Sequence, residues 1–446
     1  MSKRLRTATL NVALLGLMTV NGCQPNEQTA VDEIAPPSVE LEESKSASSA
    51  AAKAVDDPEV VTALEALGGQ IRRDASGNIT NVNLTKAGAT DQDLVDLHKL
   101  ASLKELKLSG RDITDEGLLA IGNISSLESL SIEKAEFTDA GLAHLKGLAN
   151  LKAIQLPLTN VTDEGLKHLV ELPVLARFML LRTKVSDTGM EILKSAKNRI
   201  VLLDLRDSQV TDAGLAHIGE MTKLRSLKFT SARITDAGVA HLANLKDLKS
   251  LALDNTGVTD ESMQTIAGLT MLEELYLAGC YVKDEGVQSI SGLAELKKLR
   301  LRGTFISDAG METMGGFTNL RILDLSETNI GDAGAVHLAN LAALQQLNLW
   351  FTQVTDTGAA HLTELTNLTW LKLDKTQITD ATISHLQPLK RLTFLHIGSN
   401  KLTDASLDGI GQLTNLNDLY LTFCTGISKE GREKLRRALP ETNIRF

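Results

Sequence analysis

Aromatic rings, cysteines and positive charge are all scarce in this chain of 446 residues. Nine Phe, three Tyr and two Trp make up only 3% of the sequence, so aliphatic side chains must fill the core that large rings usually help to fill. Three Cys exclude a disulfide-rich scaffold. A net charge of −10 argues against nucleic acid as a partner, because neutralising phosphates requires a basic surface. The apolar fraction of 43% and the charged fraction of 23% are typical of a folded protein.

Residues 1–22 are predicted to be a signal peptide. A basic start precedes the apolar run 8–20, which is too short to cross a bilayer as a mature helix. The run ends in Val20-Asn21-Gly22-Cys23 and resembles the lipobox of bacterial lipoproteins, although Asn21 departs from the usual pattern. The resemblance implies that Cys23 is lipidated and that the protein lies in the cell envelope, as an outer membrane lipoprotein on the periplasmic side or the surface. The alternatives are plain secretion and a cytoplasmic start.

Residues 23–56 are predicted to be a disordered tether. They combine three prolines, several acidic residues and the Ser/Ala-rich stretch 44–52, a composition that buries too little apolar surface to order itself. Such a tether would hold a folded domain away from the membrane, which the protein would contact only through its lipid anchor.

One aspartate recurs at a fixed interval through most of the chain. The step is 24 residues, with a single step of 25, and we call these residues the ladder aspartates: Asp91, Asp115, Asp139, Asp163, Asp187, Asp212, Asp236, Asp260, Asp284, Asp308, Asp332, Asp356, Asp380 and Asp404. Self-similarity at this period is the signature of a solenoid.

Each unit follows the pattern L-x-x-L-x-L-x4-[IV]-[TS]-D-x-G-L-x-x-L-x-x-L. In the unit 103–124, Leu106 and Leu108 alternate as in a strand with one buried face, whereas Leu118 and Ile121 are spaced as on one side of a helix. The Thr-Asp pair stands where the helix would begin, so either side chain could cap it. Each unit is therefore predicted to be strand, turn and helix, and stacking of units supplies the core.

This pattern resembles the leucine-rich repeat, in the T-D-x-G-L variety seen in cysteine-containing repeats of F-box-type proteins and in many bacterial proteins. The resemblance implies an α/β fold: a right-handed solenoid (horseshoe) of about 15 repeats of 24 residues, with a parallel concave sheet and convex helices. Residues 79–428 would form the repeats. Residues 57–78 are predicted to cap them as a helix and hairpin, and residues 429–446 as a last helix and edge strand.

Two recurring features suggest metal binding but are interpreted as structural. Seven histidines share one position of the repeat: His144, His168, His217, His241, His337, His361 and His385. One such residue per repeat lies about 10 Å from the next, so these histidines do not converge on a metal. The ladder aspartates lack the Gly-rich nonapeptide of calcium-binding β-rolls, so we predict no metal site and no cofactor.

Cys280 and Cys424 occupy one position of their repeats, which elsewhere holds Thr or Asn, and are predicted to bond the turn backbone. They lie six repeats apart, about 29 Å along the stack, which excludes a disulfide between them. The sequence contains no G-x-S-x-G, H-E-x-x-H, phosphate-loop or C-x-x-C motif, so we predict that the protein is not an enzyme.

The expected ligand site lies among the outward-facing strand positions of the C-terminal half. Trp370 and Phe394 take the same position in adjacent repeats, and His396 and Tyr420 share another. We call these four residues the aromatic patch, because neighbouring strands bring aligned side chains about 5 Å apart. Trp350, with Phe351 beside it, and Tyr276 are also predicted to face outward on this surface.

A basic group is a second candidate for the ligand site. Lys298, Arg300 and Arg302 all face outward from one strand. They either contact a ligand or pair with Asp324 and other acidic neighbours.

The sequence therefore predicts a non-enzymatic binding protein, exported and lipid-anchored, whose concave sheet binds a protein or peptide. Binding of a polysaccharide or cell-wall component is the alternative, since exposed rings also suit sugars. A ubiquitin-ligase-type substrate receptor is a remote alternative implied by the repeat variety, and the predicted export signal argues against it.

Overall fold

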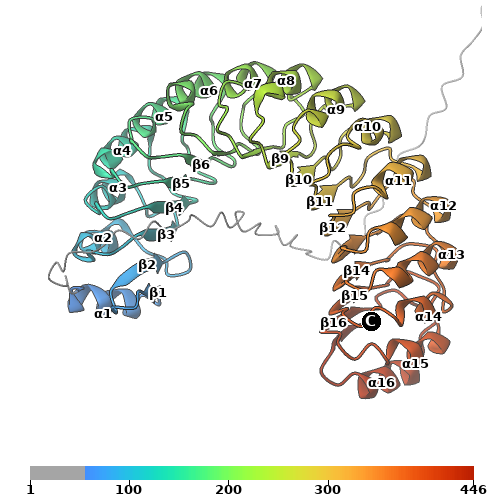
Figure 1. Ribbon diagram of the computed structural model, residues 1–446. Coiled ribbons are helices and arrows are strands. Elements are labelled where there is room, and N and C mark those ends of the chain that lie inside the picture. Colours follow the sequence, from blue (N-terminus) through green and yellow to red (C-terminus); the bar gives the residue numbers. More distant parts are fainter. Residues whose placement is uncertain (1–55) are drawn as a thin grey trace, which may run out of the picture. The chain divides into compact units, whose positions relative to one another are not determined.

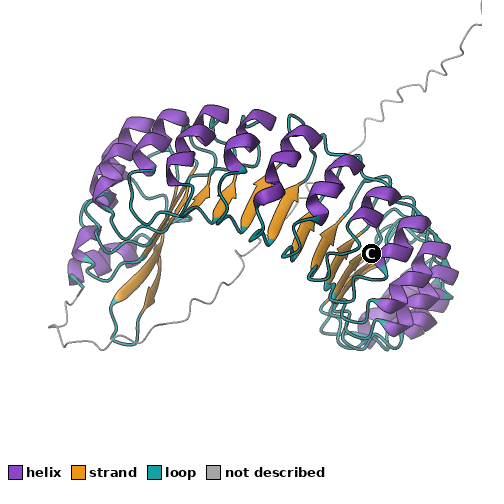
Figure 2. Cartoon of the chain, turned by 45° about the horizontal axis from the view of Figure 1, so that its top comes forward, coloured by secondary structure: helices purple, strands orange, loops and turns teal. Residues whose placement is uncertain are grey.

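The computed structural model describes residues 56–446. The predicted signal peptide, Cys23 and nearly all of the predicted tether lie outside the described residues. The described part is an open solenoid in which strands line the inner side of an arc and helices line the outer side (Figure 1). Figure 2 shows the same two layers, with the helices in purple and the strands in orange. The predicted α/β leucine-rich-repeat architecture is confirmed.

Every repeat contributes one strand to a single sheet, in which the strands after the first hairpin pair in parallel and in sequence order. The strands are β1 (Gln70–Arg73), β2 (Ile79–Asn83), β3 (Glu105–Ser109), β4 (Ser129–Glu133), β5 (Ala153–Gln155), β6 (Arg177–Met179), β7 (Leu202–Asp204), β8 (Ser226–Phe229), β9 (Ser250–Leu253), β10 (Glu274–Tyr276), β11 (Lys298–Arg300), β12 (Ile322–Asp324), β13 (Gln346–Asn348), β14 (Trp370–Lys372), β15 (Phe394–His396), β16 (Asp418–Tyr420) and β17 (Asn443–Arg445).

The helices are short, and most begin at a ladder aspartate. They are α1 (Pro58–Ala66), α2 (Asp91–Leu94), α3 (Asp115–Ile121), α4 (Asp139–Leu142), α5 (Asp163–Leu169), α6 (Asp187–Leu193), α7 (Asp212–Ile218), α8 (Asp236–Ala240), α9 (Asp260–Ala267), α10 (Asp284–Ser289), α11 (Asp308–Met314), α12 (Asp332–Ala335), α13 (Asp356–Ala359), α14 (Thr382–Leu386), α15 (Leu407–Ile410) and α16 (Lys429–Ala438). In several repeats a short 3₁₀ turn adjoins the helix, such as η1 (Leu97–Lys99) after α2.

Both ends of the sheet are covered. At the start, Asp57 caps α1 by accepting a hydrogen bond from the Glu59 N–H (2.9 Å), and β1 pairs antiparallel with β2. At the other end, β17 pairs in parallel with β16 and α16 follows the last helix of the repeats. None of the helices in residues 56–446 has both the length and the apolar character needed to cross a membrane.

The core consists of stacked columns of aliphatic side chains. Leu106 pairs in register with Leu130, and both are fully buried, as are their counterparts in the following repeats. Four rings, Phe137, Phe178, Phe229 and Phe317, are the largest buried side chains. Because each layer repeats the one before, one aliphatic side chain per position fills the space, which explains how so few rings suffice.

The two residues of the Thr-Asp pair form hydrogen bonds in different repeats. Thr211 caps α7 as predicted, because its hydroxyl accepts a hydrogen bond from the Ala213 N–H (3.3 Å). The aspartate does not cap its own helix, which corrects the expectation that either residue could do so. Asp187 instead reaches the next repeat and accepts bonds from the N–H (2.7 Å) and hydroxyl (2.7 Å) of Thr211 and from the Gly214 N–H (2.9 Å). The ladder aspartates therefore join successive repeats.

The same contact explains the glycine of the T-D-x-G-L pattern. A Cβ atom on Gly310 would lie 2.6 Å from the Oδ1 atom of Asp284, closer than such atoms approach. Ser262 stands at the equivalent position of another repeat, and its own hydroxyl donates a hydrogen bond to Asp236 there. In most repeats the position therefore holds either glycine or a side chain that donates to the carboxylate, whereas Ser406 donates to the Thr403 carbonyl.

Candidate ligand-binding surface

The four residues of the aromatic patch lie together on the inner side of the sheet. Trp370 on β14 pairs in register with Phe394 on β15, and their rings stack with centroids 5.0 Å apart and planes at 12°. Tyr420 on β16 continues the row, 5.3 Å from Phe394 and 5.1 Å from His396. Each of these side chains is half-buried, because each ring rests on its neighbours while one side stays open. The predicted juxtaposition is therefore present.

An acidic residue lies beside His396. The Oδ1 atom of Asp374 is 3.1 Å from His396 Nδ1 and 4.0 Å from Lys372 Nζ. Asp374 is only 6% exposed, and its Oδ1 forms no aligned hydrogen bond with any described residue. This acid therefore lies close to both the imidazole of His396 and the Lys372 ammonium, beside the rings.

Cations surround Trp350, which the sequence also assigns to the site. Arg302, Lys372 and Lys375 place their charged groups 5.4, 5.8 and 5.6 Å from the centre of its ring. Phe351 lies beside it, with ring centroids 6.2 Å apart. Such contacts between cations and ring faces are attractive and hold the cations over the surface.

Tyr276 differs from the other predicted site residues. It lies on β10 in the expected outward row, but its side chain is only 2% exposed. Its hydroxyl donates to Glu274 (3.2 Å), and the Arg300 guanidinium is 5.2 Å from its ring centre. Burial raises the pKa of the Tyr276 phenol. The expectation that it is an exposed ring available to a ligand is therefore wrong.

The basic group on and beside β11 is engaged with acidic neighbours. Lys298 pairs with Glu274 (2.8 Å), and Arg302 pairs with Glu327 (2.9 Å). Asp324, which stands in register with Arg300, also accepts hydrogen bonds from the N–H and hydroxyl of Ser326. Lys298 and Arg302 therefore follow the pairing interpretation, with glutamates as partners.

Several exposed rings were not predicted from the sequence. Tyr281 and Phe305 stack with centroids 6.1 Å apart, and they are 58% and 52% exposed. Phe423 is 79% exposed and, like Phe351, has a positive φ (59° and 54°), a conformation that is rare for bulky residues. The signal in the sequence was a ring at turn positions where most other repeats carry small or polar residues. Outside the core, the rings of the repeats are therefore concentrated in the C-terminal half.

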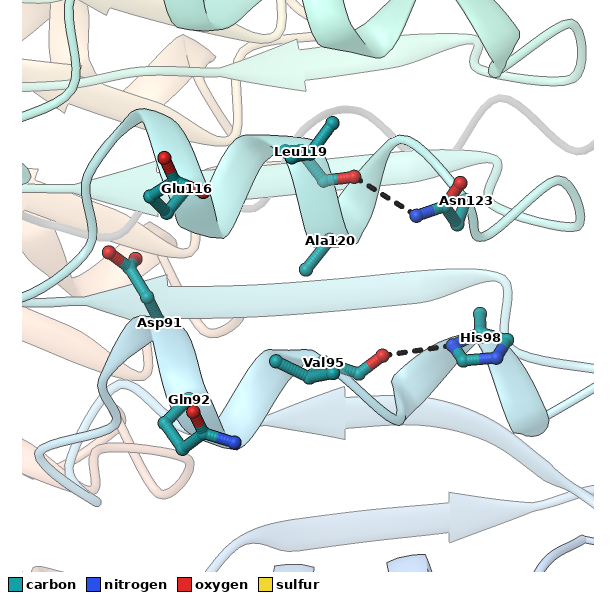
Figure 3. A pocket seen from close by; sticks show the side chains of 8 residues that line it. All are labelled: Asp91, Gln92, Val95, His98, Glu116, Leu119, Ala120 and Asn123. Carbon is teal, nitrogen blue, oxygen red and sulfur yellow. Dashed lines mark hydrogen bonds between the residues drawn. The ribbon is translucent and has the colours of Figure 1, made fainter.

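A cavity lies on the outer side, between helices of the first two repeats (Figure 3). It measures about 810 Å³ and is lined by Asp91, Gln92, Val95, His98, Glu116, Leu119, Ala120 and Asn123. His98 Nδ1 is 2.9 Å from the Val95 carbonyl, Asn123 donates to the Leu119 carbonyl, and Asp91 accepts bonds from Thr114. These three polar side chains therefore bond to neighbouring residues, and the cavity is a groove between the helices.

The recurring histidines and cysteines have no ligand-like arrangement in the described chain. Within residues 56–446 no group of three or more His, Cys, Asp or Glu side chains could hold a metal ion. Cys280 is buried and donates to the Leu253 carbonyl (3.0 Å), and Cys424 lies 3.6 Å from the Ile397 carbonyl. The predicted bonding of this position to the turn backbone is confirmed.

Solved structures similar to this chain include a leucine-rich repeat protein, an internalin and a receptor kinase. A leucine-rich repeat protein of Leptospira interrogans is 22% identical with a TM-score of 0.53, covering 86% of this chain and 98% of that one. An internalin from Listeria monocytogenes is also 22% identical, with a TM-score of 0.42 and coverage of 87% and 94%. The Arabidopsis receptor kinase HAESA, solved with a peptide hormone and a co-receptor, is 14% identical, with a TM-score of 0.45 and coverage of 84% and 75%.

Family comparison agrees with the fold. One model described as "Leucine rich repeat" matches residues 294–354, and a second matches residues 99–122, 220–243 and 268–291. Neither model indicates a catalytic family. No curated protein matches the chain. The matched segments cover part of the chain, and its solenoid fold is that of leucine-rich repeat proteins.

Proposed function

We propose that this protein is a non-enzymatic binding protein whose concave sheet holds a protein or peptide through the aromatic patch. The observation that carries the proposal is the row of Trp370, Phe394 and Tyr420, in which neighbouring rings lie 5.0 and 5.3 Å apart and are only half-buried. Aromatic side chains with one open face are the residues that most often dominate the free energy of protein recognition.

The fold itself does not require these rings. The core positions of the same strands are filled by leucines such as Leu371, Leu395 and Leu419, all fully buried. In the repeats before β10, the described rings Phe137, Phe178 and Phe229 are all buried in the core. The other repeats stack without a row of half-open rings on the inner face, and binding is the function that such a row suits.

We also propose that the protein is exported and anchored to the membrane through lipid on Cys23. The support is the sequence alone: a basic start, the apolar run 8–20, and Gly22 before Cys23. Metabolic labelling with palmitate tests the anchor, and we expect Cys23→Ala to remove the label. Label that persists in this variant would contradict lipidation and leave the binding proposal untouched.

Affinity capture tests the binding proposal. Residues 24–446 retain the whole compact unit 54–446 and serve as bait against the solubilised native envelope and a glycan array. Trp370→Ala and Tyr420→Ala are compared with wild type, and Phe305→Ala removes an exposed ring outside the patch as a matched control. We expect a protein or peptide that is captured by wild type and Phe305→Ala but lost with the two patch variants. Equal capture by all four baits refutes the site. If only a glycan is captured, and its capture depends on the rings, the ligand is a polysaccharide and not a peptide.

A further inference from the structure

We infer that the segment bound at the aromatic patch is an extended acidic peptide, with an apolar or aromatic residue between two carboxylates about five residues apart. This inference rests on the proposed function and specifies the chemistry of the partner. It follows from where the cations lie relative to the rings.

Two cations lie over rings of this surface. Arg445 lies at the Tyr420 end of the ring row, where its guanidinium is 5.0 Å from the ring centre. Lys375 lies over the pair of rings that follows β13, with its Nζ 5.6 Å from the Trp350 ring centre and 6.0 Å from that of Phe351. Both cations therefore border the surface on which the rings lie.

Neither of these two cations is neutralised by the described chain. Within residues 56–446 no acidic side chain pairs with Lys375 or Arg445, whereas Arg302 is paired with Glu327 and Lys298 with Glu274. Both residues are exposed, and the Lys375 ammonium lies against the faces of two rings. In a protein with a net charge of −10, two unneutralised cations beside an aromatic row fit a partner with negative charge.

The strand spacing sets the distance between the two carboxylates. Lys375 follows β14 and Arg445 lies on β17, so three strand steps separate them. At about 4.8 Å per step this is about 14 Å across the strands. Lys375 also lies three residues, or about 10 Å, beyond Lys372, the residue of β14 in register with Arg445, so the two positions are about 17 Å apart, which an extended chain covers in about five residues. Phe394 on β15 and Tyr420 on β16 lie between the two ends, where the apolar side chain of the ligand would rest.

The ring geometry favours a peptide over an acidic polysaccharide. Trp370 and Phe394 are nearly parallel at 12°, but Tyr420 is tilted by 39° from Phe394. Successive sugars of a chain stack best on a flat platform, and the tilt breaks this platform after two rings. A single bulky side chain fits the angle between tilted rings, as aromatic pairs commonly do.

A random-peptide library displayed on phage is the probe, selected on residues 24–446 and on the Trp370→Ala variant. We expect the peptides that depend on Trp370 to be enriched in Asp or Glu at two positions about four to six residues apart, around an aromatic or aliphatic residue. Ring-dependent peptides that are neutral or basic overturn the inference while leaving the proposed function intact. Equal enrichment on both baits instead refutes the proposed function.

Synthetic copies of the best peptide then test the two cations. The chain has only two tryptophans, Trp350 and Trp370, both at this surface, so their emission reports binding directly. We expect Lys375→Ala and Arg445→Ala each to weaken binding about two- to fivefold, with less effect at high salt. Lys390→Ala removes an exposed lysine elsewhere and should change nothing. Equal affinities for all these variants, or displacement of the peptide by acidic glycans and not by acidic peptides, would overturn the inference.

Discussion

Replacement of Asp187 by alanine should weaken the junction between two repeats without touching the ligand surface. Its carboxylate accepts three hydrogen bonds, from the N–H and hydroxyl of Thr211 and from the Gly214 N–H. An orphaned N–H group costs about 1–3 kcal/mol when buried, and this site is partly buried, so we take about 1 kcal/mol for each of the two. The hydroxyl can turn to water and adds about 0.5–1 kcal/mol. We expect a loss of about 3 kcal/mol.

Urea unfolding followed by far-ultraviolet circular dichroism measures the total loss, and hydrogen exchange locates it. Solenoids open locally, so exchange should rise first in α7 and the adjoining strands. Asp187→Asn keeps an acceptor oxygen and should lose about 1 kcal/mol. Asp247→Ala removes an acid that pairs only weakly with Lys223 (3.9 Å) and should lose less than about 0.5 kcal/mol. If Asp187→Ala were no less stable than Asp247→Ala, the role assigned to the ladder aspartates would be refuted.

Three further predictions follow from the packing. Gly310→Ala should destabilise the protein more than Gly310→Ser in thermal unfolding, because only serine can donate to the carboxylate that fills the space; equal losses would contradict this reading. Although burial raises the pKa of Asp236, hydrogen bonds outweigh it and hold that pKa below its usual value. Asp236 therefore binds a proton more readily in the unfolded state than in the folded state. Its contribution to stability should be constant above about pH 5 and be lost as the pH drops through about 4. A free energy of unfolding that is unchanged down to about pH 2 would refute this linkage. Burial raises the pKa of Cys280 and Cys424, so both thiols should react with a thiol reagent only after unfolding, and rapid labelling of the native protein would contradict their placement.

The repeat architecture was predictable because the same apolar and aspartate positions recur in nearly every unit. Strand positions such as Leu106 and helix positions such as Leu118 are fixed by burial, and burial recurs with the 24-residue step. The role of the ladder aspartates was only half predictable. A carboxylate at a helix start suggests a cap for that helix. Only the packing of successive repeats in the structure shows that the aspartate instead accepts hydrogen bonds from the next repeat.

The site was predictable as far as strand periodicity extends. The pairing of Trp370 with Phe394 follows from their equal positions in adjacent strands. Tyr276 obeys the same rule, yet it is buried with Arg300 over its ring, because the lengths of neighbouring side chains decide exposure. The stacked pair Tyr281 and Phe305 lies in turns, where alternation gives no direction for a side chain.

The dissociation constant of a captured or selected ligand, compared between wild type and the patch variants, tests the central claim most directly. Central aromatic anchors typically contribute about 2 kcal/mol or more, so Trp370→Ala and Tyr420→Ala should each weaken binding at least tenfold, while Phe305→Ala leaves it unchanged. Equal dissociation constants for all of these proteins would contradict the assignment of the concave aromatic patch as the binding site.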